Sequence, residues 1–356
     1  MVLCVLLFIS LAACNKAPVS VNEPSGSKSG PEGDTPVVND KIYEFNFACD
    51  DAATAPASAV FDEWVDEVFK ASNGRIKITM YYGGVMGAAA EQLNLVETGA
   101  ADMTHVGIGH YPGRFTLCEV FGIPGLKYED AAQVVQAVEW LYKNNEQYAA
   151  EISEVKVLGY RANCKTPISH KGAPWETAND IKGVRVNSSN AATNALTTSL
   201  GMIPTSVAFP DRYEAMSKNI IDAITSDWVA LEAFACYEVV DSICDISISI
   251  NTGFIAMSWK AWNSLPADLQ QILEECSASL GQRLAAKFKE IEIAGMEGRA
   301  AEFNVTVYKP NAEVQAAIDA AAIKAREGWI ADANSKGYDG ETFIEEVQAA
   351  LDMFKP

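Results

Sequence analysis

The chain has 356 residues, of which 49% are hydrophobic, and a formal net charge of −20. The length favours about two domains with sizeable cores, and nothing in the composition suggests a fibre or a disordered chain. Nucleic acids and anionic lipids bind basic surfaces, so the acidic balance argues against both as partners and indicates a surface that favours solubility.

The N-terminus carries an almost unbroken apolar run, residues 2–13, which ends in Leu11-Ala12-Ala13-Cys14. A helix needs about 20 apolar residues to cross a bilayer, and this run is shorter. It also ends in small residues, as signal-peptide cleavage sites do. Residues 1–14 therefore resemble a bacterial lipoprotein signal, in which Cys14 becomes the lipidated first residue. No Lys or Arg precedes the run, so we expect the true start upstream of Met1. The alternative is a plain secretory signal cut elsewhere.

Residues 15–41 are rich in Pro, Ser and Gly and lack hydrophobic periodicity. This composition predicts a flexible tether between a membrane surface and a folded domain. No later segment is apolar for long enough to span a membrane.

Six cysteines follow the signal, and neither a CxxC pair nor a zinc-site spacing occurs among them. Cys236 and Cys244 are the nearest pair for a disulfide in an exported protein. We expect small buried hydrophobic residues instead: Cys49, Cys118, Cys164, Cys236, Cys244 and Cys276.

Helices and strands alternate through the first half of the folded part. Strands are predicted at 43–49, 75–82, 101–107 and 155–161, and helices at 56–73, 91–97 and about 130–150. A second alternation runs from Val184 to about Ile250. Strands and helices at this spacing predict right-handed βαβ units and a parallel sheet.

From Pro266 to about Phe303 almost the whole sequence has a helical pattern. One helix of about 38 residues would exceed about 50 Å at about 1.5 Å per residue, which is more than one small domain covers. We therefore expect it to lie across two domains.

Catalytic and cofactor motifs are missing from the sequence: there is no GxSxG, HExxH, GxxxxGK[ST] or GxGxxG. Only three histidines, His105, His110 and His170, are available for metal or general-base chemistry. We expect no enzyme activity, no cofactor and no metal. A lipid anchor, a tether and two α/β lobes together suggest a receptor that closes on a small solute.

Several segments resemble the solute-binding receptors of tripartite ATP-independent periplasmic (TRAP) transporters. The segment "HYPGRFTLCEVFGIPGL" is similar to the family's "YxPGRFPLxEVxxLP", "NDIKGVRVN" to "DLKGLKIRV", and "GFIAMSWKAWNSLPADLQQIL" to "FxLVMNKDAWDSLPPDVQxAL". Together with the segment around residues 200–228, these blocks follow the family order over about residues 43–275.

The resemblance implies an α/β, two-lobe, periplasmic-binding-protein-like fold with a ligand cleft between the lobes and a long helix spanning both. We place lobe I at 42–163 plus 252–290 and lobe II at 164–251 plus 291–356. It also implies docking on a small and a large integral membrane subunit, with an ion gradient driving uptake.

The resemblance places the family's carboxylate-binding arginine at Asn187, two residues after Arg185. Both positions share one face of a strand, but ligands of open α/β sheets lie beyond the carboxyl ends of strands. Residue 187 is about 6 to 7 Å nearer that end. We therefore expect Asn187 to face a ligand that is not a simple carboxylate, because an amide suits neutral groups or amines. The alternative is an organic acid held by another cation, Arg161 or Lys165.

Other pocket candidates follow from their positions near strand ends. Phe209 matches the family's pocket phenylalanine, and aromatic walls with a few polar groups are typical of small-ligand sites. Ser226 and Trp228 follow a predicted strand, Asp50 comes just after the first predicted strand, and His105 lies at the end of the third. For each of these side chains the alternative is a packing or loop role.

Two other classes of function remain open from the sequence. An exported lipoprotein enzyme could reuse the same fold. A receptor could also signal to a sensor partner instead of a transporter.

Overall fold

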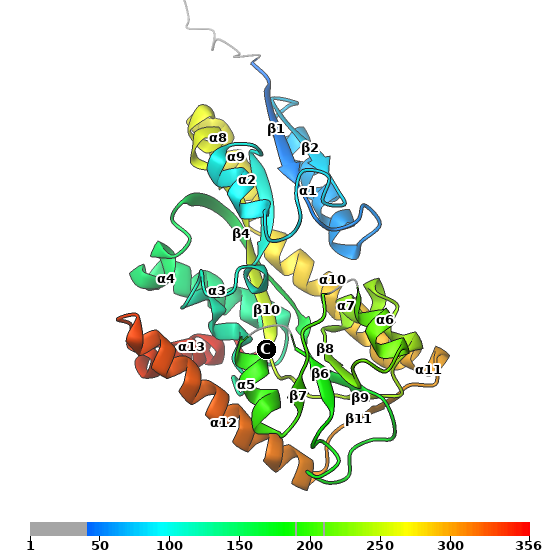
Figure 1. The fold of residues 1–356 in the computed structure, drawn as a ribbon. Coiled ribbons are helices and arrows are strands. Elements are labelled where there is room, and N and C mark those ends of the chain that lie inside the picture. The colour runs from blue at the N-terminus through cyan, green and yellow to red at the C-terminus, as the bar shows by residue number, and fades with distance from the viewer. Residues whose placement is uncertain (1–40, 189–190, 209–210) are drawn as a thin grey trace, which may run out of the picture. The chain divides into compact units, whose positions relative to one another are not determined.

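The structure is a computed structural model that describes residues 41–188, 191–208 and 211–356. The predicted signal at 1–14, nearly all of the tether and Phe209 lie outside these residues. The described residues contain two β-sheets and many helices (Figure 1), which confirms the mixed α/β prediction.

The first sheet has the strand order β2-β1-β3-β10-β4. The strands β1, β2 and β3 pair in parallel, as predicted, whereas β10 pairs antiparallel with both β3 and β4. The expectation of a parallel sheet is therefore wrong for β10, because the chain enters this strand on its return from the other sheet. The strands are β1 (Tyr43–Ala48), β2 (Ile76–Tyr81), β3 (Met103–Gly107), β4 (Val155–Lys165) and β10 (Ile250–Ser258).

Helix α1 (Pro56–Ala71) shows how the local sequence sets this layer. Its apolar stripe buries Phe61, Trp64 and Val68 completely against the sheet. The helix ends before Asn73 and Gly74, which take φ angles of 52° and 77° in the left-handed region that stops helices. Helices α2 (Gln92–Thr98), α3 (Ala131–Asn144) and α4 (Glu146–Ala150) confirm the other two predicted helical segments.

The second sheet has the order β11-β9-β5-β8-β6-β7. Helices α5 (Ala191–Ser199), α6 (Arg212–Ser217) and α7 (Trp228–Ala233) connect or follow its strands. The strands are short: β5 (Ile168–His170), β6 (Arg185–Asn187), β7 (Ile203–Pro204), β8 (Ala223–Thr225), β9 (Ser242–Cys244) and β11 (Thr306–Tyr308).

Two chain segments cross between the sheets side by side. One joins β4 to β5 and the other joins β9 to β10. At the crossing the Thr166 amide donates to the Ser249 carbonyl and the Ile248 amide donates to the Thr166 carbonyl, both at 3.1 Å. The chain passes between the two sheets at this paired crossing, which makes it a candidate hinge.

The predicted long helix is segmented. After α8 (Trp259–Ser264) come α9 (Ala267–Ser277), α10 (Leu280–Ala294), a π-helical turn at 295–299 and α11 (Ala300–Glu302). A Cβ atom at Gly281 would lie 2.3 Å from the Tyr160 carbonyl, and one at Gly295 would lie 2.5 Å from the Tyr237 hydroxyl. The run thus approaches the first sheet at one glycine and the α7 region at the other.

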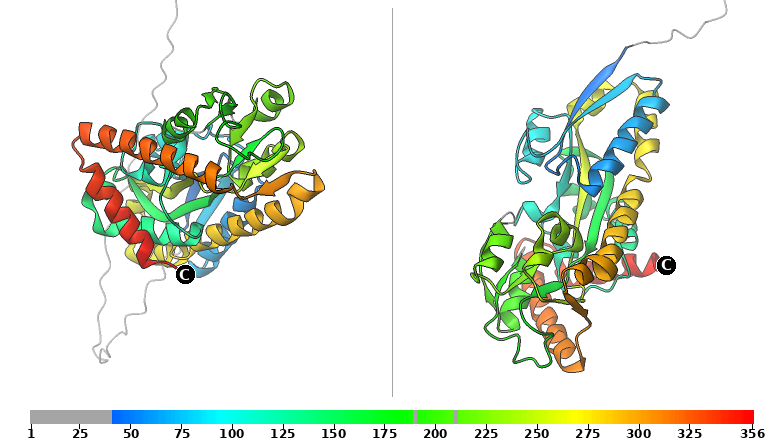
Figure 2. Two further views of the ribbon diagram at one scale, coloured as in Figure 1. Left: turned by 90° about the horizontal axis from the view of Figure 1, so that it is seen from below. Right: turned by 90° about the vertical axis from the view of Figure 1, so that its right-hand side faces the viewer.

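The C-terminal helices α12 (Ala312–Ser335) and α13 (Gly340–Met353) are shown in orange and red in Figure 2. Val314 and Ile318 of α12 join the core around the second sheet, whereas Trp329 and Phe343 join the core around the first. The division into lobes at 42–163 plus 252–290 and 164–251 plus 291–356 stays a prediction.

All six cysteines of the described chain are free and buried, as expected. Among the residues that the structure describes, no helix combines the length and apolar character that a membrane crossing requires.

Candidate functional site

A cavity of about 1030 Å³ is lined by residues from both sheets and the helices beside them. The first sheet contributes residues at the ends of β1, β3 and β4 and the start of β10. The second contributes the segment after β8, and small side chains of α5, α7 and α12 add apolar walls. A large cavity with a few convergent polar groups is the usual form of a small-molecule site.

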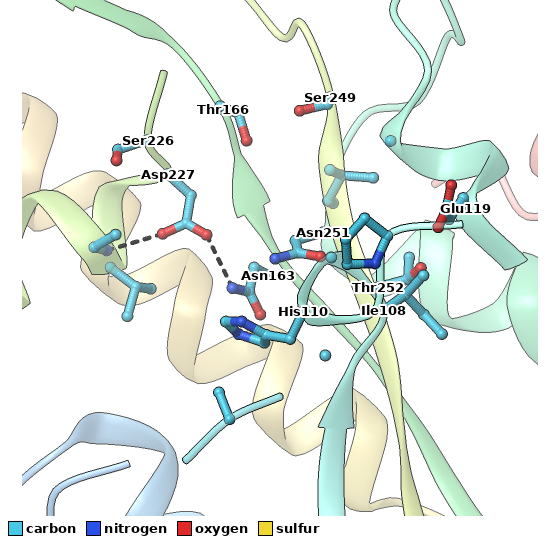
Figure 3. Close-up of a pocket in the computed structure, with 18 of the residues that line it drawn as sticks. Ile108, His110, Glu119, Asn163, Thr166, Ser226, Asp227, Ser249, Asn251 and Thr252 are labelled. Carbon is cyan, nitrogen blue, oxygen red and sulfur yellow. Dashed lines mark hydrogen bonds between the residues drawn. The ribbon is translucent and has the colours of Figure 1, made fainter. Parts of the chain in front are cut away.

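Figure 3 shows polar side chains from several elements pointing into this cavity. Asp227 follows β8 and caps α7, because one carboxylate oxygen accepts from the Ala230 amide at 2.9 Å. Its other oxygen accepts from the Asn163 side-chain amide, also at 2.9 Å. Asp227 therefore links the second sheet to β4 of the first across the cavity.

Arg161 lies on β4, two residues before Asn163, and its side chain is 9% exposed. Its Nη2 donates to the Asn163 side-chain oxygen at 2.8 Å, and its Nη1 lies 2.5 Å from Nδ1 of His105. The guanidinium also stands 5.6 Å from the centre of the Phe288 ring. Among the described residues that line the cavity, Arg161 is the one lysine or arginine.

His105 lies at the end of β3 and is 4% exposed. Its Nε2 is 3.1 Å from an Asp50 oxygen and 3.6 Å from an Asp51 oxygen. Burial lowers the pKa of His105, but the two carboxylates outweigh burial and raise it to about 10. Burial likewise raises the pKa of Asp50, and the nearby His105 and Arg161 outweigh it and lower that pKa to about 2.

The two sides of the His105 ring have opposite effects on its charge. In the neutral ring Nη1 of Arg161 donates to Nδ1, which leaves the ring proton on Nε2 facing the carboxylates. Arg161 therefore opposes the second protonation that Asp50 and Asp51 favour.

The structure brings four of the predicted site residues to one cavity: Asp50, His105, Arg161 and Ser226. Asn187 and Trp228 are not among the described lining residues. Asn187 is 2% exposed, and its side-chain amide donates to the carbonyls of Thr205 and Val207. Trp228 is completely buried in a core cluster. The role of Asn187 in ligand binding stays a prediction.

The remaining candidates lie elsewhere. Phe209 and Cys14 are outside the described residues. Arg185 pairs with Asp222 at 2.6 Å and is partly buried. Lys165 ends β4 and is not among the described lining residues.

Sequence reasoning missed several lining residues. Asp227 directly follows Ser226, and Asn163 lies on the same face of β4 as Arg161. Their positions near strand ends could therefore have predicted both residues. Asn251 and Thr252 lie on β10, and only the antiparallel insertion of that strand brings them to the cavity. His110 and Glu119 come from the loop after β3 and a 3₁₀ turn, where no periodicity marks them.

One group of described residues has the donor types of a metal site. The ligand atoms of Cys49, Asp51 and His105 lie within 4.8 Å of one another. Thiolate, carboxylate and imidazole together suit a zinc-like ion. The proton on Nε2 of His105 opposes this use, because a metal needs that lone pair.

Comparison with known proteins links the chain to a family. A family model described as bacterial extracellular solute-binding protein, family 7, matches residues 50–329. The 2,3-diketo-L-gulonate-binding periplasmic protein of Escherichia coli (strain K12) is 21% identical over 296 residues, which is 82% of this chain and 87% of the relative. A solute-binding protein of Sulfitobacter sp. (strain NAS-14.1) is 24% identical over 65% of this chain and 68% of its own.

Solved structures share the fold. A TRAP solute-binding protein from a marine metagenome, specific for aromatic acid ligands and bound to 3-hydroxybenzoate, matches with a TM-score of 0.80 and 21% identity, over 89% of this chain and 100% of that chain. A TRAP solute-binding protein of Chromohalobacter salexigens with bound D-glucuronate matches with a TM-score of 0.75 and 16% identity, over 86% and 99%. At these identities the likeness shows the two-lobe fold.

Proposed function

We propose, because the chain belongs to the bacterial extracellular solute-binding proteins of family 7, that this protein captures a small organic acid and passes it to a TRAP-type transporter. Proteins of this family are extracytoplasmic, substrate-binding receptors of transporters and not enzymes. The solved relatives bind 3-hydroxybenzoate and D-glucuronate, and the Escherichia coli relative is named for 2,3-diketo-L-gulonate. All three ligands carry a carboxyl group.

The observation that carries the proposal is the position of Arg161 in the cavity. A guanidinium holds five N–H donors in a fixed fork that matches a carboxylate. Two of its nitrogens already contact His105 and Asn163, which fix the orientation of the group. Buried and oriented, Arg161 supplies the charge-assisted bonds that a carboxylate needs on leaving water.

The sequence left two kinds of ligand open, and the proposed ligand is the second of them, an organic acid whose carboxylate is held by Arg161. The other hypothesis, a ligand without a carboxylate, depends on Asn187 facing the ligand. In the structure the amide of Asn187 instead donates to two backbone carbonyls. We therefore base ligand recognition on Arg161 and the lining residues Asp50, His105 and Ser226.

The crossing at Thr166 and Ser249 supports capture by closure. Two chain segments connect the sheets there, so a rotation about this crossing would change the opening of the cavity. We place the moving bodies at the lobe boundaries predicted from the sequence. Closure would exclude water and strengthen each charged contact to the ligand.

The predicted signal and tether complete the proposal. A lipid anchor at Cys14 and the tether predicted at residues 15–41 would hold the receptor at a membrane, near the small and large integral subunits. Metabolic labelling with a fatty acid tests this part, since Cys14→Ser should abolish the label. Persistent labelling of Cys14→Ser would refute the anchor.

Calorimetry against aromatic and sugar acids tests the central proposal. Loss of a charge-assisted bond is worth about 1.5 to 3 kcal/mol, so Arg161→Met should weaken acid binding by about ten- to 150-fold. Arg114→Met is the matched control, because Arg114 is outside the cavity and pairs with Glu97 on the surface. Equal acid affinity in Arg161→Met and the wild type would refute the role of Arg161.

A further inference from the structure

Ser226 brings a buried hydroxyl to the cavity from the segment that follows β8. The residue is 4% exposed and lies beside Asp227 in Figure 3. Its oxygen accepts a hydrogen bond from Nη1 of Arg212 at 2.5 Å. Among the residues that the structure describes, none accepts the proton of this hydroxyl. A buried donor without an acceptor is costly, so the proton needs a partner from the cavity.

Arg212 decides how this hydroxyl can bind. It begins α6, is 1% exposed and is not among the described lining residues. A guanidinium donates hydrogen bonds and never accepts them, so the Ser226 oxygen has to be the acceptor and its proton points away from Arg212. The positive charge of Arg212 also polarises the hydroxyl and strengthens the bond that it donates. A side chain that could donate or accept therefore presents a donor to the cavity.

The charges around Ser226 indicate what kind of acceptor fits. Burial lowers the pKa of Arg212 to about 10, so the guanidinium keeps its charge near pH 7. The carboxylate of Asp227 lies near enough to oppose this shift. The two charges thus offset each other beside the hydroxyl. A second ligand carboxylate at this point would be repelled by Asp227, whereas an uncharged oxygen would not.

We propose that Arg212 fixes Ser226 as a hydrogen-bond donor to the ligand, and that the ligand carries an uncharged carbonyl or hydroxyl oxygen there, in addition to the carboxylate on Arg161. Arg212 is a positioning residue, because it acts through Ser226. Arg161 comes from β4 and Ser226 from the segment after β8, so the ligand is held from both sheets. The inference rests on the proposed function and names a second group on the ligand of the same cavity.

The competing explanation is that Arg212 only stabilises the fold around the start of α6. Loss of a packing role would weaken the binding of every ligand alike. Loss of a fixed donor would weaken only ligands that present an acceptor to Ser226. The ratio of affinities within a matched pair of probes therefore separates the two explanations.

The test uses the full chain and matched pairs of acids. Calorimetry compares benzoates that carry an acetyl or an isopropyl group at position 3 or 4, and pentanoates that carry an oxo or a methyl group at position 2 or 4. Acetyl and isopropyl groups have nearly the same shape, but only the acetyl group has an oxygen acceptor. In the best-bound pair we expect the probe with the additional oxygen to bind about three- to tenfold more tightly.

Four variants assign this preference to its residues. Ser226→Ala should bring the affinity ratio close to one while the affinity for the probe without the additional oxygen changes less than threefold. Arg212→Gln should do the same, because the glutamine oxygen can accept the Ser226 proton. Arg212→Lys keeps a charged donor and should keep the ratio. Arg299→Gln is the control, because Arg299 pairs with Glu232 and is not among the described lining residues.

The outcomes distinguish this inference from the proposed function. If acids bind through Arg161 but every matched pair binds the wild type equally, the inference is wrong and the proposed function stands. The role of Arg212 is refuted if folded Arg212→Gln keeps the ratio or weakens both probes equally, or if folded Arg212→Lys loses the ratio. If none of the acids binds, both proposals are wrong. Thermal unfolding of each variant without probe confirms that it is folded.

Discussion

Gly281 and Gly328 offer a matched test of how α10 packs on the first sheet. Gly328 lies in the interior of α12, where alanine gains about 1 kcal/mol of helix propensity, whereas Gly281 is the second residue of α10, where the gain is smaller. At Gly328 in α12 a Cβ atom would meet nothing within 4 Å. At Gly281 in α10 it would lie 2.3 Å from the Tyr160 carbonyl oxygen and 2.9 Å from a Val135 methyl.

The clash at Gly281 involves backbone, so no side-chain rotation relieves it. The helix would have to withdraw from β4 by about 1 Å, and overpacking of this kind costs about 1 to 3 kcal/mol. Part of the difference between the two variants is the smaller propensity gain at Gly281, which accounts for at most about 1 kcal/mol, and the rest measures the clash. We expect the unfolding free energy of Gly328→Ala to rise by about 1 kcal/mol and that of Gly281→Ala to lie about 1 to 4 kcal/mol lower.

Urea unfolding followed by tryptophan fluorescence measures this difference from the two midpoints with a common slope. Solute binding by Gly281→Ala, compared with the wild type because Gly328 itself lines the cavity, gives a second readout. Tyr160 precedes Arg161 on β4, so a displaced strand moves the guanidinium. If Gly281→Ala proves as stable as Gly328→Ala, the close approach of α10 to β4 is wrong.

Three further predictions follow from other contacts. The Glu151 carboxylate accepts hydrogen bonds from the backbone amides of Thr116, Leu117 and Cys118 at 2.9 to 3.0 Å. Urea unfolding should therefore show that Glu151→Gln lowers the unfolding free energy by about 1 to 3 kcal/mol, whereas Glu154→Gln, at an exposed position, leaves it unchanged. Asp50 has its pKa lowered from 3.8 to about 2, so its stabilisation is present above pH 3.8 and is lost as pH falls towards 2. The unfolding free energy of Asp50→Asn should therefore be about 2 kcal/mol below that of the wild type near pH 7, and the two should become nearly equal as the pH falls to about 2 and below. A difference in unfolding free energy that does not change with pH would contradict this. Burial raises the pKa of the thiols of Cys118, Cys164, Cys236 and Cys244. Because the thiolate is the reactive form, a disulfide reagent should label the buried cysteines of residues 41–356 only after the protein unfolds. Rapid labelling of the folded protein would refute their burial.

The local sequence predicted most elements of the first sheet and its helices. The stripe of Phe61, Trp64 and Val68 predicted α1, and Asn73 with Gly74 predicted its end. These signals are local, because a helix or strand repeats its buried face at a fixed period. The family resemblance then supplied the two-lobe arrangement, which the solved relatives share.

The sequence could not predict how distant segments meet. It did not reveal that β10 enters the first sheet antiparallel, nor that the helical run from 267 to 302 is segmented. It also did not reveal that the side-chain amide of Asn187 donates to the carbonyls of Thr205 and Val207, which follow the edge strand β7.

The sequence by itself determined most helices and strands of the first sheet and which family the chain resembles, because those properties repeat or align along the chain. Only the tertiary structure decided that Arg161, His105 and Asp50 share one cavity, since 56 residues separate Arg161 from His105 and the two meet through strand pairing. The charge of the cavity depends on such long-range pairings, and hydrophobic periodicity does not encode them.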